Sequence, residues 1–332
     1  MGPAASYARP MPDGPGRLAS APVEVVTLGE VMALMLAEGS AALSQAARFD
    51  LSVAGAEGNV AVGLARLGHS VAIWSCLGED ALGDVVLRSL RGEGLDVSGV
   101  RRVADRPTGL IVRDAPLGRP VTVGYYRGGS AGAALGPQDV LPEVIRGARL
   151  LHLTGITAML SDSSHSAVLL AAEQARAAGV TVSVDPNLRL RLAPVEQWRE
   201  RLDPLLRAAD VVLTGRDELE LLSGAADPGW LLDQGAGTVV VKDGAAGAYE
   251  TDGRTVLRVG ARSVPLVDPV GAGDAFAAGW LSGWLRGVPA QRRLDEAAVV
   301  AGCVVSARGD LAGLPTAAVR DALLRSAPDV AR

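Results

Sequence analysis

Short apolar segments alternate with segments of helical periodicity along most of this chain, and this alternation limits the folds open to it. The apolar segments are VEVVTLG (23–29), SVAIWSCLG (70–78), ARLLHLTG (148–155), VTVSVDPN (180–187), ADVVLTG (209–215) and GTVVVKDG (237–244). Segments between them, such as AEGNVAVGLARLG (56–68), place apolar residues at helical spacing and end at a glycine. Strands that are apolar on both faces and separated by helices predict a doubly wound, mostly parallel sheet with helices on both sides, an α/β/α fold. Ligands of such folds bind at the carboxyl ends of the strands.

One region breaks the alternation. TGLIVRDA (108–115) and RPVTVGYYRGGSAG (119–132) are strand-like with no helix between them, and PLG (116–118) joins them as a turn. ARFDLSV (47–53) is a further strand-like run. We expect a small β-sheet lid with strands from about 33–53 and 108–128, the alternative being an extra edge hairpin. Exposed lid edges also predict a homodimer or higher homo-oligomer that forms through the lid.

Composition narrows the class of protein. The 332 residues, 48% of them apolar, suit one large domain, which we expect over 23–325, after a flexible tail at 1–22 that lacks the apolar core of a signal peptide. The net charge of −5 gives no reason to expect nucleic-acid binding, and no apolar run is long enough for a membrane span. Cys76 and Cys303 are far apart in apolar segments and are expected to be reduced thiols, which favours a cytoplasmic protein.

The segment DPVGAGDAFAAGW (268–280) carries the chemistry. It has neither the lysine of a Walker loop nor the third glycine of a dinucleotide fingerprint. Gly271, Ala272 and Gly273 can present backbone N–H groups at a helix N-terminus, where an anion is stabilised. Asp274 follows in the first helical turn, where a carboxylate could take a proton from a hydroxyl or could cap the helix.

A second segment, AGAEGNVAVGLARLG (54–68), strengthens this interpretation. Together with DPVGAGDAFAAGWL it resembles the two signatures of the ribokinase-like (PfkB) carbohydrate kinases, and the resemblance extends from about Val23 to Pro315. It implies that Asp274 is the general base, that residues 271–273 form the anion hole, and that Gly55 and Asn59 bind the sugar. It also implies ATP and Mg²⁺ as cofactors.

The resemblance assigns further positions to the nucleotide and the metal. VVVKDGAAGAYE (239–250) is similar to the family's nucleotide loop, which places Lys242, Gly244 and Gly247 along the ATP; spacing alone favours a plain hairpin turn for the glycines. In TGRDELELL (214–222), Glu218 corresponds to a glutamate that organises Mg²⁺ through water, although Gly215 stands where the family has asparagine. SARGDLAG (306–313) resembles a segment that flanks the adenine and, in some members, a monovalent cation such as K⁺.

The substrate is indicated by charge. GEVMALM (29–35) lacks the aspartate that many neutral-sugar kinases of the family carry there, whereas Tyr125 and Arg127 share one face of a lid strand and Arg189 follows another strand. Two arginines suit a carboxylate, unless they are solvated surface residues. The pattern resembles 2-keto-3-deoxygluconate (KDG) kinases and implies ATP-dependent phosphorylation of a sugar acid at its primary hydroxyl, giving the 6-phosphate. Ile111 stands where that group often has a substrate tyrosine.

Two alternatives remain at this point. One is a kinase for a neutral sugar such as fructose or ribose. The other is a non-catalytic sugar- or nucleotide-binding protein, which Gly215 and Ala298 favour because many family members carry asparagine at both positions, whereas an intact Asp274 opposes it.

Overall fold

The computed structural model describes residues 23–39, 42–115 and 120–325. The expected tail at 1–22 and the expected turn at 116–118 lie outside these residues. The described chain contains a nine-stranded sheet in the order β13-β12-β11-β10-β9-β8-β1-β4-β5. Its strands are β1 (Val25–Leu28), β4 (Val71–Gly78), β5 (Val100–Val103), β8 (Leu150–Thr154), β9 (Thr181–Asp185), β10 (Val211–Gly215), β11 (Thr238–Lys242), β12 (Ala248–Thr251) and β13 (Val256–Val259).

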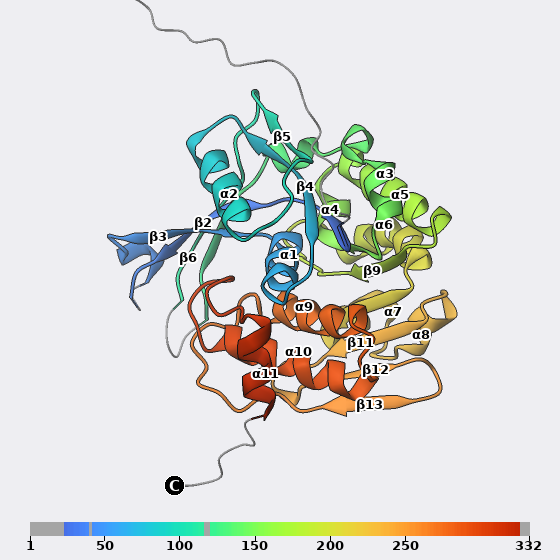
Figure 1. The fold of residues 1–332 in the computed structure, drawn as a ribbon. Coiled ribbons are helices and arrows are strands. Elements are labelled where there is room, and N and C mark those ends of the chain that lie inside the picture. The colour runs from blue at the N-terminus through green and yellow to red at the C-terminus, as the bar shows by residue number, and fades with distance from the viewer. Residues whose placement is uncertain (1–22, 40–41, 116–119, 326–332) are drawn as a thin grey trace, which may run out of the picture.

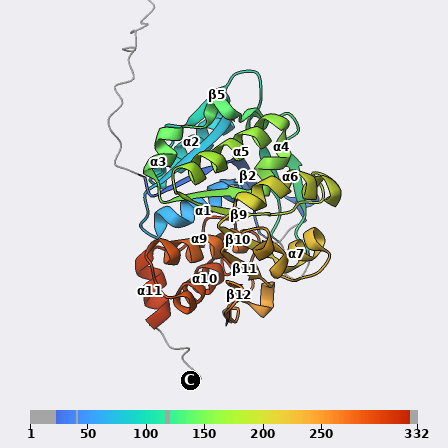
Figure 2. The same cartoon turned by 90° about the vertical axis from the view of Figure 1, so that its right-hand side faces the viewer.

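The large sheet is parallel from β5 to β11, β12 pairs antiparallel with β11, and β13 pairs antiparallel with β12, so that β12 alone runs in the reverse direction. The helices around it are α1 (Ala56–Arg66), α2 (Ala81–Gly92), α3 (Pro142–Gly147), α4 (Gly155–Leu160), α5 (Asp162–Ala177), α6 (Val195–Ala208), α7 (Arg216–Ser223), α8 (Gly229–Asp233), α9 (Ala272–Leu285), α10 (Ala290–Val305) and α11 (Ala317–Arg325). Figures 1 and 2 show α9 to α11 gathered at one side of the molecule and α3, α5 and α6 at another.

The sheet divides the core into two parts because successive residues of a strand point to opposite faces. In β10, Val211 and Leu213 pack into the cluster formed with α1, α2, α9 and α10. Val212, between them, packs into the cluster formed with α5, α6 and α7. The uniformly apolar strands of the sequence are therefore buried on both faces, and the predicted doubly wound α/β/α fold is confirmed.

A second, four-stranded sheet has the order β3-β2-β6-β7. It consists of β2 (Met32–Ala37), β3 (Phe49–Ala54), β6 (Leu110–Arg113) and β7 (Val123–Tyr126). Figure 1 shows β2, β3 and β6 extending to one side of the large sheet. Residues 40–41 and 116–119, between its strands, lie outside the described residues.

Candidate active site

A cavity of about 90 Å³ lies where the small sheet meets the carboxyl ends of the large sheet. Its walls combine the start of α1, the small sheet, the loop after β9 and the loop before α9. The lining residues are Met32, Ala54, Gly55, Ala56, Asn59, Ile111, Arg113, Val123, Tyr125, Arg127, Ile156, Arg189, Val270, Gly271, Asp274 and Asp310. Asn59 and Asp274, which are 215 residues apart in sequence, thus share one hollow at the edge where parallel α/β sheets bind ligands.

Glycine is required where this cavity meets the backbone. Gly271 is the N-cap of α9 with φ of +82°, and a Cβ there would lie 3.2 Å from the Cα of Asp310. Gly55 has φ of +150°, and its Cβ would lie 2.4 Å from the carbonyl oxygen of Glu30. Both positions need the left-handed backbone and the close approach that only glycine tolerates. The start of α9 therefore meets the cavity at Gly271 with no side chain at that position, while Ala272 N donates to the carbonyl oxygen of Pro269 at 3.3 Å.

Asp274 is held by two amide side chains. Its Oδ2 accepts a hydrogen bond of 2.8 Å from Asn59 Nδ2, and its Oδ1 accepts one of 3.3 Å from Asn187 Nδ2. Asn187 has φ of +46°, a left-handed backbone that asparagine tolerates better than most residues. α9 has no side-chain capping bond at its N-cap. The carboxylate thus points toward the cavity and toward α1 and the β9 loop.

The environment of Asp274 changes its acidity. Dense surrounding protein raises the pKa of Asp274 to about 7, the hydrogen bond from Asn59 opposes the rise, and the nearby carboxylate of Asp185 adds to it. The side chain is nevertheless only half-buried, so solvent still reaches it. A carboxylate with a pKa near neutrality is suited to take and return a proton.

A lysine that the loop sequence lacks is supplied by another strand. Lys242, at the end of β11, places its ammonium 3.6 Å from the position that a Cβ on Gly273 would take. Lys242 Nζ pairs with Asp185 Oδ2 at 2.5 Å, and its side chain is 16% exposed. Burial lowers the pKa of Lys242, but Asp185 and Glu218 outweigh burial and hold that pKa above its usual value. A cation therefore stands beside the loop.

The Glu218 carboxylate accepts hydrogen bonds from the backbone of two segments. Its Oε2 accepts from Gly215 N at 2.8 Å at the start of α7, and its Oε1 accepts from Leu188 N at 2.9 Å. Burial, followed by the charge of Asp185, raises the pKa of Glu218. Among the described residues, no group of three or more His, Cys, Asp or Glu side chains is arranged to hold a metal ion by itself. Asp185 and Glu218 still suit Mg²⁺, which takes one or two carboxylates together with phosphate oxygens and water.

The predicted substrate residues differ in their surroundings. Tyr125 on β7 is exposed, and Arg189, which is about half exposed, donates to the carbonyl oxygen of Leu188 at 2.7 Å. Arg127 is only 10% exposed and pairs with the buried carboxylate of Glu30. That carboxylate also accepts from Ser130 Oγ. Arg189 is thus more exposed than Arg127, although its Nη1 also lies 3.8 Å from Glu218 Oε1. Ile111 forms an apolar part of the wall.

The predicted nucleotide loop forms a tight connection between β11 and β12. Asp243 N donates to Gly247 O at 2.8 Å, and the backbone N–H of Ala246 donates to Asp243 O at 2.9 Å. A Cβ on Gly247 would lie 2.0 Å from the carbonyl oxygen of Val259, whereas a Cβ on Gly244 would meet nothing within 4 Å. Packing between β12 and β13 therefore explains Gly247, and Gly244 remains open toward solvent.

Sequence reasoning missed several groups of this site. Glu30 follows β1, Asp185 ends β9, and both are buried. Glu57 in α1 is buried and accepts from Thr154 and Thr157 hydroxyls at 2.7 and 2.5 Å, and burial raises its pKa. Position at a strand's carboxyl end is the signal that could have found Glu30 and Asp185.

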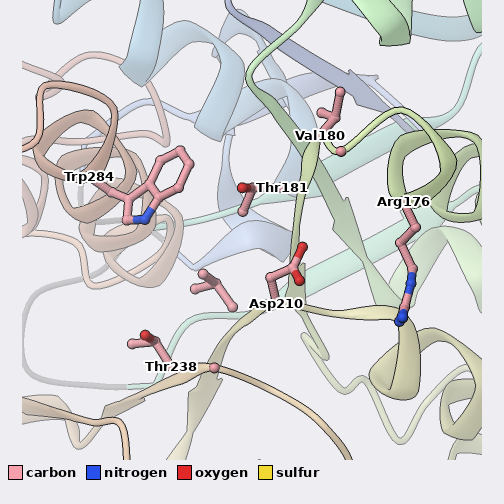
Figure 3. Close-up of a pocket in the computed structure, with 9 residues that line it drawn as sticks. Arg176, Val180, Thr181, Asp210, Thr238 and Trp284 are labelled. Atoms are coloured by element: carbon pink, nitrogen blue, oxygen red, sulfur yellow. The ribbon is translucent and has the colours of Figure 1, made fainter.

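A larger hollow of about 460 Å³ lies elsewhere (Figure 3). It is bounded by the first residues of β9, β10 and β11, namely Thr181, Val211 and Thr238, together with Asp210 and Trp284. These are the amino ends of the strands, opposite to the edge that binds ligands in such folds. Asp210 there accepts from Val182 N at 2.8 Å, so its carboxylate is occupied by the backbone. The smaller cavity is the better candidate because charged groups converge on it.

Comparison with known proteins agrees with this geometry. The model of the pfkB family of carbohydrate kinases matches residues 23–317. A 2-dehydro-3-deoxygluconokinase of Bacillus subtilis is 37% identical over 301 residues, covering 89% of this chain and 93% of that protein. A 2-dehydro-3-deoxygluconokinase of Thermoproteus tenax is 35% identical over 315 residues, covering 93% and 96%.

A solved structure supports the same family. An E. coli protein described as a ribokinase II, in complex with ATP and Mg²⁺, superimposes with a TM-score of 0.84 and 26% identity, covering 91% of this chain and 99% of that chain. The chain therefore belongs to the pfkB family of carbohydrate kinases. No helix within the described ranges is long and apolar enough to cross a membrane.

Proposed function

We propose that the protein transfers the γ-phosphoryl group of ATP to the primary hydroxyl of a sugar acid, with 2-keto-3-deoxygluconate as the substrate and its 6-phosphate as the product. The observation that carries this proposal is the convergence on one cavity of Asp274, the glycine-rich start of α9 and the side chains of Arg189 and Tyr125. The two curated relatives, both named 2-dehydro-3-deoxygluconokinase, support the substrate.

The reaction follows from the groups around the cavity. Asp274 takes the proton of the sugar hydroxyl as that oxygen forms its bond to the γ-phosphorus, and the bond to the β,γ-bridging oxygen breaks to release ADP. The N–H groups of Gly271, Ala272 and Gly273 stabilise the charge on the transferring group at the positive end of α9. Lys242 adds a cation close to Gly273.

Substrate and nucleotide are assigned to opposite sides of Asp274. Gly55, Asn59, Tyr125, Arg127 and Arg189 hold the sugar acid, with Arg189 as the principal partner of its carboxylate because its side chain is far more exposed than that of Arg127. Lys242, Gly244 and Gly247 follow the ATP, and closure of the small sheet excludes water from the reaction.

We assign metal binding to the carboxylates near Lys242. Asp185 and Glu218 are the carboxylates that would hold Mg²⁺, Glu218 through water because both its oxygens accept from backbone N–H groups. When bound, Mg²⁺ neutralises phosphate charge and orients the β- and γ-phosphates.

The assembly and compartment are further parts of the proposal. The sheet order leaves β3 and β7 as the outer strands of the small sheet, and Leu51 and Tyr126 on them are exposed, which supports pairing with a second copy. Light scattering on the purified protein tests this, and a monomer at micromolar concentration contradicts it. The free thiols of Cys76 and Cys303 and the use of ATP support a cytoplasmic enzyme.

A neutral-sugar kinase is the second candidate, favoured by the pairing of Arg127 with Glu30, which reduces the positive charge available to an acid. The deciding experiment compares ADP release with KDG, gluconate, fructose and ribose at equal concentrations. We expect the highest kcat/KM with KDG. A preference for fructose or ribose contradicts the sugar-acid assignment, and no sugar-dependent ADP release at all contradicts the kinase reaction.

A further inference from the structure

Arg113 joins the small sheet to the loop that carries Asp274. It is the last residue of β6, yet its side chain is only 1% exposed and points into the body of the protein instead of toward solvent. Its guanidinium forms two ion pairs, Nη1 with Asp268 Oδ2 at 2.8 Å and Nη2 with Asp310 Oδ1 at 2.7 Å. A buried arginine shared by two carboxylates has a defined geometry because its N–H groups form a rigid fork.

The first partner fixes the beginning of the 268–274 loop. Asp268 is fully buried, and its Oδ1 accepts from Val270 N at 3.1 Å. Its Oδ2 accepts from Gly309 N at 3.0 Å in addition to Arg113. The Asp268 carboxylate therefore connects the 268–274 loop, the turn at 309 and the small sheet. Arg113 offsets the cost of burying the negative charge of Asp268.

The second partner leads to Asp274 itself. Asp310 Oδ2 accepts from Asn59 Nδ2 at 3.2 Å, and the same Nδ2 donates to Asp274 Oδ2 at 2.8 Å. The Cα of Asp310 also lies 3.2 Å from the position of a Cβ on Gly271. A continuous chain of polar contacts thus runs from Arg113 through Asp310 and Asn59 to the base.

The charges explain why a cation is needed at this place. Asp268 and Asp310 are both buried within the segments that surround the start of α9. Left unpaired, two carboxylates there would oppose the charge of a γ-phosphate at the same helix end and would favour the protonated form of Asp274. Arg113 offsets both through direct contact, and it does so from a position with almost no solvent screening.

The same contacts affect whether a monovalent cation can bind at the 306–313 segment, where the family resemblance places one in some members. All four carboxylate oxygens of Asp268 and Asp310 accept from N–H donors of Arg113, Asn59, Val270 or Gly309. A cation such as K⁺ needs oxygen atoms that are free to coordinate it. No oxygen of these two carboxylates is without a hydrogen bond, and the guanidinium already supplies positive charge between them.

We propose that Arg113 is a positioning residue that acts as a built-in cation: it holds the 268–274 loop and, through Asp310 and Asn59, the base Asp274, so that this kinase needs no bound monovalent cation. The inference rests on the proposed phosphoryl transfer. A merely structural Arg113 would fasten the small sheet to the body without any effect on charge at the reaction centre, and the experiments are chosen to separate these roles.

The first experiment measures nucleotide binding by calorimetry in buffer whose only monovalent cation is choline. Because the proposed reaction places the γ-phosphate at the start of α9, Arg113→Ala should weaken ATP–Mg²⁺ by about tenfold, as expected for a lost charge interaction, while ADP–Mg²⁺ binds as in the wild type. This measurement needs no sugar, so it tests Arg113 even if the proposed substrate is wrong. Equal affinities of wild type and variant for ATP, or equal losses for ATP and ADP, overturn the proposal.

The second experiment measures kcat in choline, in K⁺ and in guanidinium buffers. The wild type should be insensitive to K⁺, whereas Arg113→Ala should lose about 100-fold in kcat and recover at least about tenfold with added guanidinium, which fits the vacated site. In Arg113→Ala, the pH below which kcat/KM falls should be higher than in the wild type, since the unpaired carboxylates favour protonation of Asp274. Added guanidinium should shift that pH back toward the wild-type value. A wild type that requires K⁺, or a folded Arg113→Ala with unchanged kcat and pH profile, contradicts the inference.

Two further variants serve as controls. Arg320→Ala removes another buried arginine, one that pairs with Asp321 in α11 and lies near Glu296. It should lower thermal stability without any guanidinium-dependent change in activity. If Arg113→Ala does not fold, Arg113→Lys, which keeps the charge but cannot span both carboxylates, should lose about tenfold in kcat, with no change in the pH below which kcat/KM falls. Full activity of Arg113→Lys contradicts the proposal that a guanidinium contacting both carboxylates is required.

Discussion

Two cations flank the 268–274 loop, and they are built differently. Lys242 reaches Gly273 from β11 of the large sheet, pairs with Asp185 and keeps part of its side chain exposed. Arg113 reaches Asp268 from β6 of the small sheet and is almost completely buried, with both ends of its guanidinium engaged. The loop is therefore flanked by one cation that is accessible enough to contact a ligand and by one that contacts only protein groups.

The largest expected effect concerns Asp274, the proposed general base. Asp274→Asn keeps the shape of the side chain and removes its ability to accept a proton, so kcat should fall by about 10³-fold while ATP and sugar acid still bind. Rapid-mixing kinetics with calorimetry of both ligands measure this. Near-normal turnover in the variant means that another group takes the proton, and the two cations then do not flank the reaction centre.

Removal of the ligand-facing cation should come next in size. Lys242→Met should lower kcat/KM for ATP by about 10²-fold, since a charge directed at the transferring phosphate is lost. Unlike Arg113→Ala, it should not recover with guanidinium, because the space at Lys242 opens to solvent and to the nucleotide. Rescue of both variants by guanidinium removes the distinction between the two cations.

Arg127, the proposed substrate residue that follows β7, should give a smaller effect. Arg127→Ala should raise KM for KDG by about 20-fold with little change in KM for ATP, because a charged hydrogen bond to the acid is lost. It also leaves Glu30 buried without its partner, which lowers stability.

The matched double variant separates these two consequences. Arg127→Ala combined with Glu30→Gln should regain thermal stability but not KDG affinity. If the double variant regains both, Arg127 acts only as the partner of Glu30.

The smallest effect is the pH dependence. As the proposed general base, Asp274 acts in its deprotonated form, and burial raises its pKa to about 7. kcat/KM should therefore fall by about tenfold from pH 8 to pH 6, with a midpoint near that pKa. A flat profile from pH 6 to 8 contradicts the burial effect.

Stability should respond to the same group in the opposite direction. Because the folded pKa lies above the unfolded one, the native state binds more protons between about pH 4 and 7, and stability falls as pH rises through this window. Asp274→Asn should thus melt above the wild type at pH 8, and this difference should shrink toward pH 5. A difference independent of pH points to packing instead of charge.

Much of the fold was predictable because its signals are local. Apolar runs such as 209–215 and glycine-terminated helical patterns predicted the parallel sheet and its covering helices, and the comparisons confirm both fold and family. Asn59 and Asp274 were named as site residues from two short segments, and the structure brings them within 2.8 Å of each other. Their roles in the reaction remain predictions.

Pairings between distant side chains could not be predicted. Arg127 was expected to face the substrate, but nothing in YYRGG shows that Glu30 lies against it. The lysine missing from the 268–274 loop is supplied by β11, and Arg113 and Asp310 meet across 197 residues of sequence. Such contacts depend on the register and the order of strands, which periodicity does not encode.

By itself, the sequence determined the alternation that makes a doubly wound sheet and the glycines that keep the start of α9 open. These follow from backbone conformation and side-chain polarity at single positions, which act over a few residues. Only the tertiary structure decided which charges neutralise one another: Lys242 with Asp185, Arg127 with Glu30, and Arg113 with Asp268 and Asp310. The physical reason is that electrostatic energy depends on distance and burial, and both are set when remote segments pack together.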